Sequence, residues 1–227
     1  MAEQGTKLWY LEQVDILKGL NMEEMMRVAE RTRMSGAIRN QRIYFPDEPS
    51  DTIYFLKQGK IKIATTNEEG KEMVRAVLFP GEVFGEMAII GEGMRRDQAI
   101  ALDDDVIVCS MSLRDAQDMM MRDTRLQLAF TRVIGERSIA LQRRLENLVF
   151  KDSRSRILEL LRTMAHEHGR RIGHEVLLDH SLTHQDIADL SATARQTVST
   201  LLSELEKKNV LHQERGRFLF RDLSALN

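Results

Sequence analysis

Side chains that suit the recognition of nucleic-acid bases lie at regular spacing within residues 182–211. Two capping boxes in this segment, Thr183 with Asp186 and Thr193 with Gln196, each predict the start of a helix. The apolar residues of the second helix fall at i, i+3, i+4 and i+7, a spacing that places them on one buried stripe. The face opposite that stripe then carries Arg195, Gln196, Ser199, Thr200 and Ser203.

The residue types on this face match the hydrogen-bonding groups of a DNA major groove. An arginine can donate two hydrogen bonds to guanine, a glutamine can form two with adenine, and serine or threonine fits a base edge or a phosphate. The exposed face of the second helix carries no acidic residue through Ser203, and three small residues, 191–193, join the two helices. The segment therefore predicts a helix-turn-helix, and the alternative is a solvated face on an ordinary pair of helices.

Flanking residues add further expected contacts with DNA. Residues 211–220 are predicted to form a hairpin that turns at Arg215-Gly216, a wing whose Arg217 can reach a phosphate. His184 falls in the first turn of the first helix, where it either contacts a phosphate or is simply a solvated side chain. The residues expected to contact DNA are Thr183, His184, Thr193, Arg195, Gln196, Ser199, Thr200 and Arg217.

The remaining sequence divides into a β-rich part and a long helical part. Short alternating segments between about residues 36 and 111 are separated by glycine turns, which predicts an antiparallel barrel or jelly roll. Helical spacing precedes these segments at residues 8–34, with an N-cap at Asn21, and follows them at residues 112–150. Further helices are predicted at residues 152–168, 183–190 and 194–207.

The helical segment 112–150 carries a narrow apolar seam. Successive seam residues lie four, seven, four and three positions apart, which approximates the 3.5-residue repeat of a coiled coil. We therefore expect a homodimer formed through this helix, and the alternative is a helix that packs on its own domain. The expected interface residues are Phe130, Ile134, Arg137, Leu141, Leu145 and Leu148.

The composition excludes several classes of protein. The 227 residues include 33 basic and 35 acidic side chains, and the net charge of −2 excludes a broadly cationic protein that coats nucleic acid or lipid. The single cysteine, Cys109, excludes an internal disulfide framework and a four-cysteine iron–sulfur cluster within one chain. Because the sequence has neither a secretory signal nor an apolar run long enough to cross a bilayer, we expect a cytoplasmic protein with no membrane contact.

The sequence lacks the patterns typical of an enzyme or a metal site. A glycine-rich phosphate loop followed by Lys-Ser/Thr and a Gly-x-Ser-x-Gly motif are both absent, so we expect no catalysis. The spacing of His166, His168 and His174 does not place two imidazoles on one helical face, so we expect no metal site.

Three stretches of the chain together carry a resemblance to a known family. They are PGEVFGEMAIIGEG at 80–93, NLVFKDSRSRILELL at 147–161 and LTHQDIADLSATARQTVSTLLSELEKKNVL at 182–211. With the order of barrel, seam helix and winged helix-turn-helix, they resemble the catabolite activator / fumarate-nitrate regulator (CRP/FNR) superfamily of bacterial transcription factors. The resemblance covers about residues 10–222. It implies a homodimer that binds a two-fold symmetric site on double-stranded DNA and contacts RNA polymerase.

The resemblance also implies an α+β fold in three parts. Residues 1–112 are expected to form a cyclic-nucleotide-binding-like β jelly roll that acts as a sensor, residues 113–150 a long dimerisation helix, and residues 151–227 a winged helix-turn-helix. Family members read DNA through an arginine at the start of the recognition helix, which Arg195 matches. The usual glutamate after it is Gln196 here, and a frequent second arginine is replaced by Thr200. We therefore expect a target that differs from the common TGTGA-like half-site.

The effector site matches the family less completely. Relatives that bind cyclic AMP use a Gly-Glu pair for the ribose, matched by Gly85-Glu86, and an Arg-Ser pair for the phosphate, where this sequence has Arg96-Asp97. An aspartate beside the cyclic phosphate places two like charges together, a repulsion of about 1 kcal/mol or more. The hydroxyl pair that such relatives place on the long helix falls on Leu141 and Gln142. Cyclic AMP is therefore not the expected effector, and the candidate effector-pocket residues are Gly85, Glu86, Met87, Arg95, Arg96, Asp97, Leu141 and Gln142.

Several alternatives for the input stay open. Gly85 and Glu86 can be residues of the fold, and the barrel can bind an organic anion through Arg75, Arg95 or Arg96, or no ligand at all. A haem usually needs an axial histidine or cysteine, for which residues 1–150 offer only Cys109, although methionine ligation is a further route. We expect no cofactor beyond an unidentified small molecule. The functional alternatives are a cyclic-AMP-responsive regulator and a small-molecule-sensing module that docks a protein rather than DNA.

Overall fold

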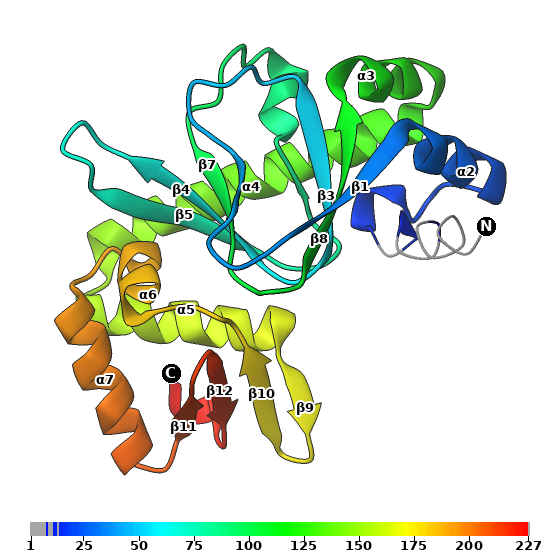
Figure 1. The fold of residues 1–227 in the computed structure, drawn as a ribbon. Helices are drawn as coiled ribbons and strands as arrows, with labels where there is room; N and C mark the ends of the chain where they lie inside the picture. Colours follow the sequence, from blue (N-terminus) through cyan, green and yellow to red (C-terminus); the bar gives the residue numbers. More distant parts are fainter. Residues whose placement is uncertain (1–7, 9–10, 13, 227) are drawn as a thin grey trace. The chain divides into compact units, whose positions relative to one another are not determined.

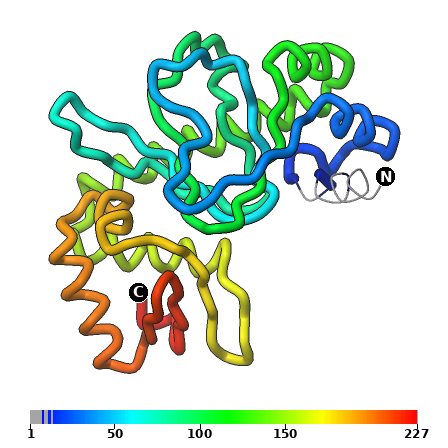
Figure 2. The backbone as a smooth tube through the Cα atoms, in the orientation of Figure 1, coloured from blue at the N-terminus to red at the C-terminus, as the bar shows by residue number. Residues whose placement is uncertain are grey.

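The structure, a computed structural model, describes residue 8, residues 11–12 and residues 14–226. Its contacts divide the chain into one unit of residues up to 72 with 77–140, and a second unit of residues 73–76 with those from 141 onward. The division falls within one long helix, so the boundaries expected at residues 112 and 150 stay a prediction. Figure 1 labels most helices and strands of each unit, and Figure 2 follows the same backbone as a tube.

The N-terminal unit contains a 3₁₀ turn, η1 (Asp15–Leu17), and helix α2 (Met22–Arg31). The Asn21 side chain accepts a hydrogen bond from the Glu24 amide, and the Glu24 carboxylate accepts one from the Asn21 amide. This capping box confirms the predicted helix start. The helix ends earlier than the spacing at residues 8–34 indicates, because Thr32 already pairs with a strand; positions 9–10 and 13 of that spacing lie outside the described residues.

The described part of this unit contains eight strands that form the predicted jelly roll (Figure 1). They make two four-stranded sheets, in the orders β1-β8-β3-β6 and β2-β7-β4-β5. Neighbours such as β3 and β8 run antiparallel, as the glycine-punctuated pattern indicates. The strands are β1 (Thr32–Ala37), β2 (Arg42–Tyr44), β3 (Thr52–Gln58), β4 (Ile61–Thr66), β5 (Glu72–Leu78), β6 (Val83–Phe84), β7 (Gln98–Ala101) and β8 (Val106–Ser112).

The central strand β3 contributes to two clusters of buried apolar side chains. Ile53 and Phe55 pack with Val28 of α2 in one cluster. Tyr54 and Leu56 contact the other cluster, inside the roll. This division follows from the strand geometry, because successive side chains of a strand point to opposite faces. The roll therefore has an interior that side chains fill and an outer face that the helices cover.

Two helices follow the roll where the sequence predicts continuous helical spacing at residues 112–150. They are α3 (Leu113–Arg122) and α4 (Thr124–Phe150), which are separated at Asp123, whose backbone is extended. The Asp123 carboxylate accepts hydrogen bonds from the Arg125 amide and guanidinium, which satisfies one free amide at the start of α4. Helix α4 has 27 residues and is therefore about 40 Å long. Neither it nor any other described helix combines the length and apolar character needed to cross a membrane.

The C-terminal unit packs three helices with a four-stranded sheet of order β11-β12-β10-β9. The predicted hairpin at residues 211–220 is formed by β11 and β12, which turn at Arg215-Gly216. This arrangement confirms the predicted winged helix-turn-helix. Its elements are α5 (Ser153–His168), β9 (Arg170–Ile172), β10 (Glu175–Asp179), α6 (His184–Ser191), α7 (Arg195–Lys207), β11 (Leu211–Glu214), β12 (Arg217–Phe220) and η3 (Leu223–Leu226).

Leu202 provides a test of the packing that holds α7 in place. It is fully buried, so we expect Leu202→Ala to lower the free energy of unfolding by about 2–5 kcal/mol, through lost apolar contact and an unfilled cavity. Urea denaturation followed by circular dichroism measures this loss. The matched control is Ser203→Ala, whose side chain is exposed and whose effect should stay within about 0.5 kcal/mol. Equal unfolding midpoints for the two variants would contradict the packing described.

Candidate nucleic-acid interface and candidate effector site

Thr183 is the N-cap of helix α6, as the sequence predicts. The Thr183 hydroxyl oxygen accepts a hydrogen bond from the Asp186 amide at 3.1 Å, and the Asp186 carboxylate accepts one from the Thr183 amide at 2.8 Å. The Thr183 hydroxyl also donates to the Asp186 carboxylate at 2.6 Å. Asp186 is buried, so the hydrogen bonds of this capping box are shielded from water, and they hold the first turn of α6 in place.

The second predicted capping box is wrong. Helix α7 starts at Arg195, one residue later than that box requires, and its N-cap is Ala194, which has no side chain able to bond the free amides. Thr193 instead places its hydroxyl 3.0 Å from that of Ser191, within the turn. The turn itself depends on Ala192, whose left-handed backbone (φ 49°) reverses the chain between the two helices.

Arg156 of α5 ties this turn to the rest of the unit. Its guanidinium donates to the Ser191 carbonyl at 2.9 Å, the Ala192 carbonyl at 2.8 Å and the Lys151 carbonyl at 2.7 Å. The bonds to Ser191 and Ala192 satisfy carbonyl groups left open where α6 ends. Sequence reasoning missed this residue, because no local pattern signals a contact between positions so far apart in the chain.

Helix α7 presents most of the predicted polar face to solvent. Arg195, Gln196 and Thr200 are exposed. Ser199 is half-buried; its hydroxyl donates to the Arg195 carbonyl at 3.1 Å and lies 2.9 Å from His184 Nδ1. The opposite stripe is buried as predicted and consists of Val198, Leu201, Leu202 and Leu205. The structure therefore brings one candidate of α6 against one of α7, through the contact between His184 and Ser199.

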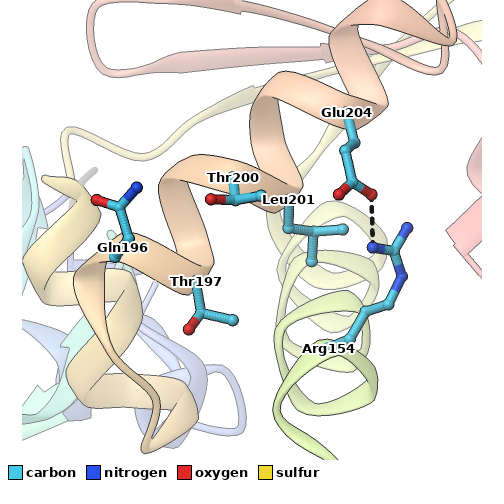
Figure 3. Close-up of a pocket in the computed structure, with 6 residues that line it drawn as sticks. All are labelled: Arg154, Gln196, Thr197, Thr200, Leu201 and Glu204. Atoms are coloured by element: carbon cyan, nitrogen blue, oxygen red, sulfur yellow. Dashed lines mark hydrogen bonds and ion pairs between the residues drawn. The ribbon is translucent and has the colours of Figure 1, made fainter.

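A hollow of about 340 Å³ adjoins the polar face of α7 (Figure 3). Gln196 and Thr200 line it from α7, and Arg154 reaches it from the first turn of α5. Arg154 donates a hydrogen bond of 2.6 Å to the Glu204 carboxylate, which joins the two helices at the side of the hollow. The Arg154 guanidinium holds the pKa of Glu204 below its usual range, so this carboxylate is ionised at neutral pH.

Arg217 is an exposed residue at the start of β12, next to the turn of the wing. Its guanidinium lies 3.3 Å from the Asp179 carboxylate on the neighbouring strand β10. Both side chains remain about half exposed, so the pair is open to water and to exchange of partners. Gly216 at the turn has φ +74°, and its carbonyl accepts hydrogen bonds from the His180 and Ser181 amides. The wing is thus anchored at its turn while Arg217 points outward.

The candidate effector site in the N-terminal unit is occupied by arginines of the same chain. Arg95 is 3% exposed and donates hydrogen bonds to the carbonyls of Gly85, at 3.3 Å, and Thr52. Its guanidinium also stacks over the Tyr44 ring, 4.4 Å from the centroid. Gly85 has φ +73°, and a Cβ there would lie 2.8 Å from Arg95 Nη1, so only glycine leaves room for this side chain.

Glu86 is likewise engaged within the N-terminal unit. It is 3% exposed and forms an ion pair with Arg137, which also donates to the Val83 carbonyl. The two residues matched to a ribose-binding pair thus already have arginine partners, Arg95 at the Gly85 carbonyl and Arg137 at Glu86. A ligand that used either group would have to displace a charged hydrogen bond.

The other candidate effector residues are placed differently. Arg96 is exposed and borders a hollow of about 620 Å³ that is also lined by Arg95 and residues 91–94. Asp97 accepts a hydrogen bond of 3.0 Å from the Tyr44 hydroxyl, and burial together with this carboxylate raises the pKa of Tyr44. Met87 is exposed on the short helix η2 (Glu86–Ile90). Leu141 and Gln142 are exposed residues of α4 that are grouped with the C-terminal unit.

The predicted dimer seam on α4 is only partly exposed. Phe130 is 4% exposed and packs in the core of the N-terminal unit, so the alternative of intramolecular packing holds for this residue. Arg137 is held by Glu86, and Ile134 is half-buried. The seam residues that remain on the surface are Leu141, Leu145 and Leu148; further exposed apolar residues of α4, which the seam spacing missed, are Leu128, Ile139, Val149 and Phe150.

Metal ligands are not gathered anywhere in the described part of the chain: no group of three or more histidine, cysteine or acidic side chains there could hold an ion. The single cysteine, Cys109, is buried in the core between β1 and β3.

Comparison with known families identifies two domains in the chain. The Cyclic nucleotide-binding domain family matches residues 38–123, and the Crp-like helix-turn-helix domain family matches residues 155–227. These ranges contain the jelly roll with its candidate effector site and the helix-turn-helix with its wing.

Proteins of related sequence and structure span most of the chain. The CRP-like cAMP-activated global transcriptional regulator of Mycobacterium tuberculosis is 25% identical over 217 residues, 95% of this chain and 96% of its own. The Global nitrogen regulator of Nostoc sp. is 27% identical over 176 residues, 76% and 78% of the two chains. The structure of FixK2 from Bradyrhizobium japonicum shares the fold with a TM-score of 0.75 at 19% identity, over 86% of this chain and 95% of that one. The chain therefore belongs to the CRP/FNR superfamily and is a CRP-like transcription regulator, with a cyclic nucleotide-binding domain and a C-terminal helix-turn-helix DNA-binding domain.

Proposed function

We propose that this regulator is a homodimer that binds a two-fold symmetric site on double-stranded DNA through the exposed face of α7. One observation carries the proposal: α7 buries one apolar stripe and leaves Arg195, Gln196 and Thr200 exposed, with no acidic residue before Glu204. A helix of this kind can enter a major groove with its first turns against the base edges. The proposed activity is binding rather than catalysis, and it requires access to chromosomal DNA in the bacterial cytoplasm and contact with RNA polymerase.

The proposed base contacts come from the start of α7. Arg195 suits a guanine and Gln196 an adenine, since each can form two hydrogen bonds with the edge of that base. Thr200, one turn later, offers a hydroxyl and a methyl group where many relatives place a second arginine. The half-site is therefore proposed to differ from TGTGA while still containing a guanine opposite Arg195.

Proposed contacts with the DNA backbone surround these residues. Thr183 lies at the start of α6 and Thr193 in the turn before α7, and the hydrogen-bonded pair of His184 and Ser199 joins the two helices. Arg217 is supported as a phosphate contact because a half-exposed ion pair with Asp179 is weak enough to be exchanged for a phosphate. Contacts of this type position the protein on the duplex without selecting the sequence.

The proposed dimer forms through α4. Leu141, Leu145 and Leu148 are exposed on this helix, and burial of apolar area against a second copy would remove them from water. Two copies related by a two-fold axis present two α7 helices, which matches a two-fold symmetric DNA site.

The proposed effector is a small molecule other than cyclic AMP. Two contacts and one residue difference support this: Arg95 bonds the Gly85 carbonyl, Arg137 pairs with Glu86, and Asp97 places a carboxylate where relatives have a serine. Cyclic AMP remains the second candidate, because the match to the Cyclic nucleotide-binding domain favours it. A module that docks a protein in place of DNA would lack the salt dependence that phosphate contacts produce.

The proposed role of Arg195 can be tested on a duplex obtained by selecting binding sites from random DNA. We expect Arg195→Ala to weaken specific binding by about 1–3 kcal/mol per half-site, because the bidentate contact with guanine is lost. Fluorescence anisotropy with the labelled duplex measures the affinity. Affinity for the duplex should also fall steeply as salt rises, in proportion to the number of phosphates contacted.

The control for this test is Arg122→Ala, an exposed arginine of α3 outside the helix-turn-helix. It should leave the affinity unchanged. Equal affinities for Arg195→Ala and the parent protein would refute the assignment of α7 as the recognition helix, and salt-independent binding would favour the docking of a protein.

The dimer interface can be tested at Leu145. We expect Leu145→Glu to raise the dissociation constant of the dimer by at least about tenfold, because a charged group would have to be buried at the interface. Sedimentation velocity measures the monomer–dimer equilibrium. The control is Glu136→Ala, which lies about two and a half turns earlier and so on the opposite face of α4. A dimer as stable in Leu145→Glu as in the control would exclude this part of α4 from the interface.

Cyclic AMP can be tested directly by thermal unfolding. A ligand that binds only the folded protein raises the midpoint temperature, so we expect millimolar cyclic AMP to cause no more change than millimolar 5′-AMP. Differential scanning fluorimetry measures both. A rise of several degrees with cyclic AMP alone would show that the contacts of Arg95 and Arg137 yield to the nucleotide, and would favour the second candidate.

A further inference from the structure

We infer that Arg154, at the start of α5, is a DNA contact outside the helix-turn-helix, and that Glu204 is the positioning residue that aims it. The guanidinium is proposed to donate hydrogen bonds to a phosphodiester oxygen next to the bases that α7 reads. The inference rests on the proposed function, since it adds a contact to the same interface. The proposed partner of Arg154 is the phosphodiester group, and not a particular base.

The position of Arg154 is the first support. It borders the hollow of about 340 Å³ that Gln196 and Thr200 line from α7 (Figure 3). Gln196 and Thr200 are exposed candidates for base contacts, so a duplex held against α7 would cover the mouth of this hollow. A guanidinium at its side would then lie within the rim of the interface, where contacts with the DNA backbone are made.

The bonding of Arg154 is the second support. Among the described residues only Glu204 accepts a hydrogen bond from it, at 2.6 Å, and both side chains stay nearly half exposed (45% and 43%). Water and salt weaken such a pair, so it adds little to the stability of the fold. Arg156, two residues later, contrasts with it, because each nitrogen of that guanidinium donates to a backbone carbonyl of the protein. Arg154 therefore keeps donors available for a ligand.

The charge of Glu204 is the third support. Glu204 is the first acidic residue of α7, and an unpaired carboxylate at the edge of a DNA-binding face would repel phosphate. Arg154 neutralises it, and the carboxylate in turn restricts the long arginine side chain to one region. Because an arginine fork can pair with an oxyanion on each side, Arg154 can keep Glu204 while it binds a phosphate. Glu204 thus orients the contact and does not itself touch DNA.

The experiment compares variants on the duplex selected by the parent protein. We expect Arg154→Ala to weaken binding about five- to tenfold and to lower the slope of log affinity against log salt by about one per half-site, with the preferred sequence unchanged. Arg154→Lys should retain the slope, because it keeps the charge, but lose part of the affinity with the bidentate fork. The matched control is Arg162→Ala on the same helix: its side chain is 43% exposed, it forms an ion pair with Glu159, and it does not line the hollow.

A double variant separates contact from neutralisation. If Arg154 bonds a phosphate, Arg154→Ala with Glu204→Gln regains only the part of the affinity that the unpaired carboxylate cost, remains weaker than the parent protein, and keeps a low salt slope. Recovery of the parent affinity in the double variant would mean that Arg154 only cancels the charge of Glu204, and would overturn the inference. Thermal unfolding of each variant should match the parent protein, as expected for an exposed pair, and Arg154→Gln replaces Arg154→Ala if the latter does not fold.

The outcome distinguishes this inference from the proposed function. If the parent protein selects a duplex and Arg154→Ala binds it with unchanged affinity and salt slope, only the role of Arg154 is refuted. If the parent protein selects no duplex, the proposed function and this inference both fail.

Discussion

Burial of the apolar stripe of α7 determines which groups the C-terminal unit offers to a partner. Val198, Leu201, Leu202 and Leu205 are nearly inaccessible to solvent, and exposing them would cost the free energy of hydrating large aliphatic side chains. Since a helix is rigid, fixing this stripe against the unit also fixes the directions of Arg195 and Gln196. The polar face therefore needs no support of its own. The same constraint places Glu204 next to Arg154, because a residue at the edge of the buried stripe faces the neighbouring helix α5.

In both units, arginine side chains bond oxygen atoms of the same chain. Arg156 satisfies carbonyl groups at the turn of the helix-turn-helix, and in the N-terminal unit Arg95 and Arg137 bond Gly85 and Glu86. A guanidinium has five donors in a planar fork, which suits it to several oxygen atoms at once. In the jelly roll, the bonds of Arg95 and Arg137 give the Gly85-Glu86 pair a structural role. The pair resembles a ribose site in sequence, but its acceptors are bonded to the protein itself.

Local patterns predicted the elements well where a few neighbouring residues decide the outcome. The capping boxes at Asn21 and Thr183 and the hairpin turn at Arg215-Gly216 each involve about four consecutive residues, and all three occur. The start of α7 was misjudged, because Thr193 has the residue type of an N-cap but is drawn into a contact with Ser191. The break at Asp123 was missed for a similar reason. A helical period continues across it, and only the extended backbone and the bonds to Arg125 reveal the cap.

The sequence by itself determined the jelly roll, the winged helix-turn-helix and the outward face of α7, because hydrophobic periodicity and turn residues act over short distances. Tertiary structure alone decided which polar groups are available. The spacing of the apolar residues of α4 predicts a single seam, yet Phe130 is buried in the N-terminal unit while Leu145 is exposed. Arg95 and Arg96 are adjacent and chemically identical, yet one is buried against Tyr44 and the other faces solvent. Availability depends on packing between distant segments, and periodicity carries no information about those contacts.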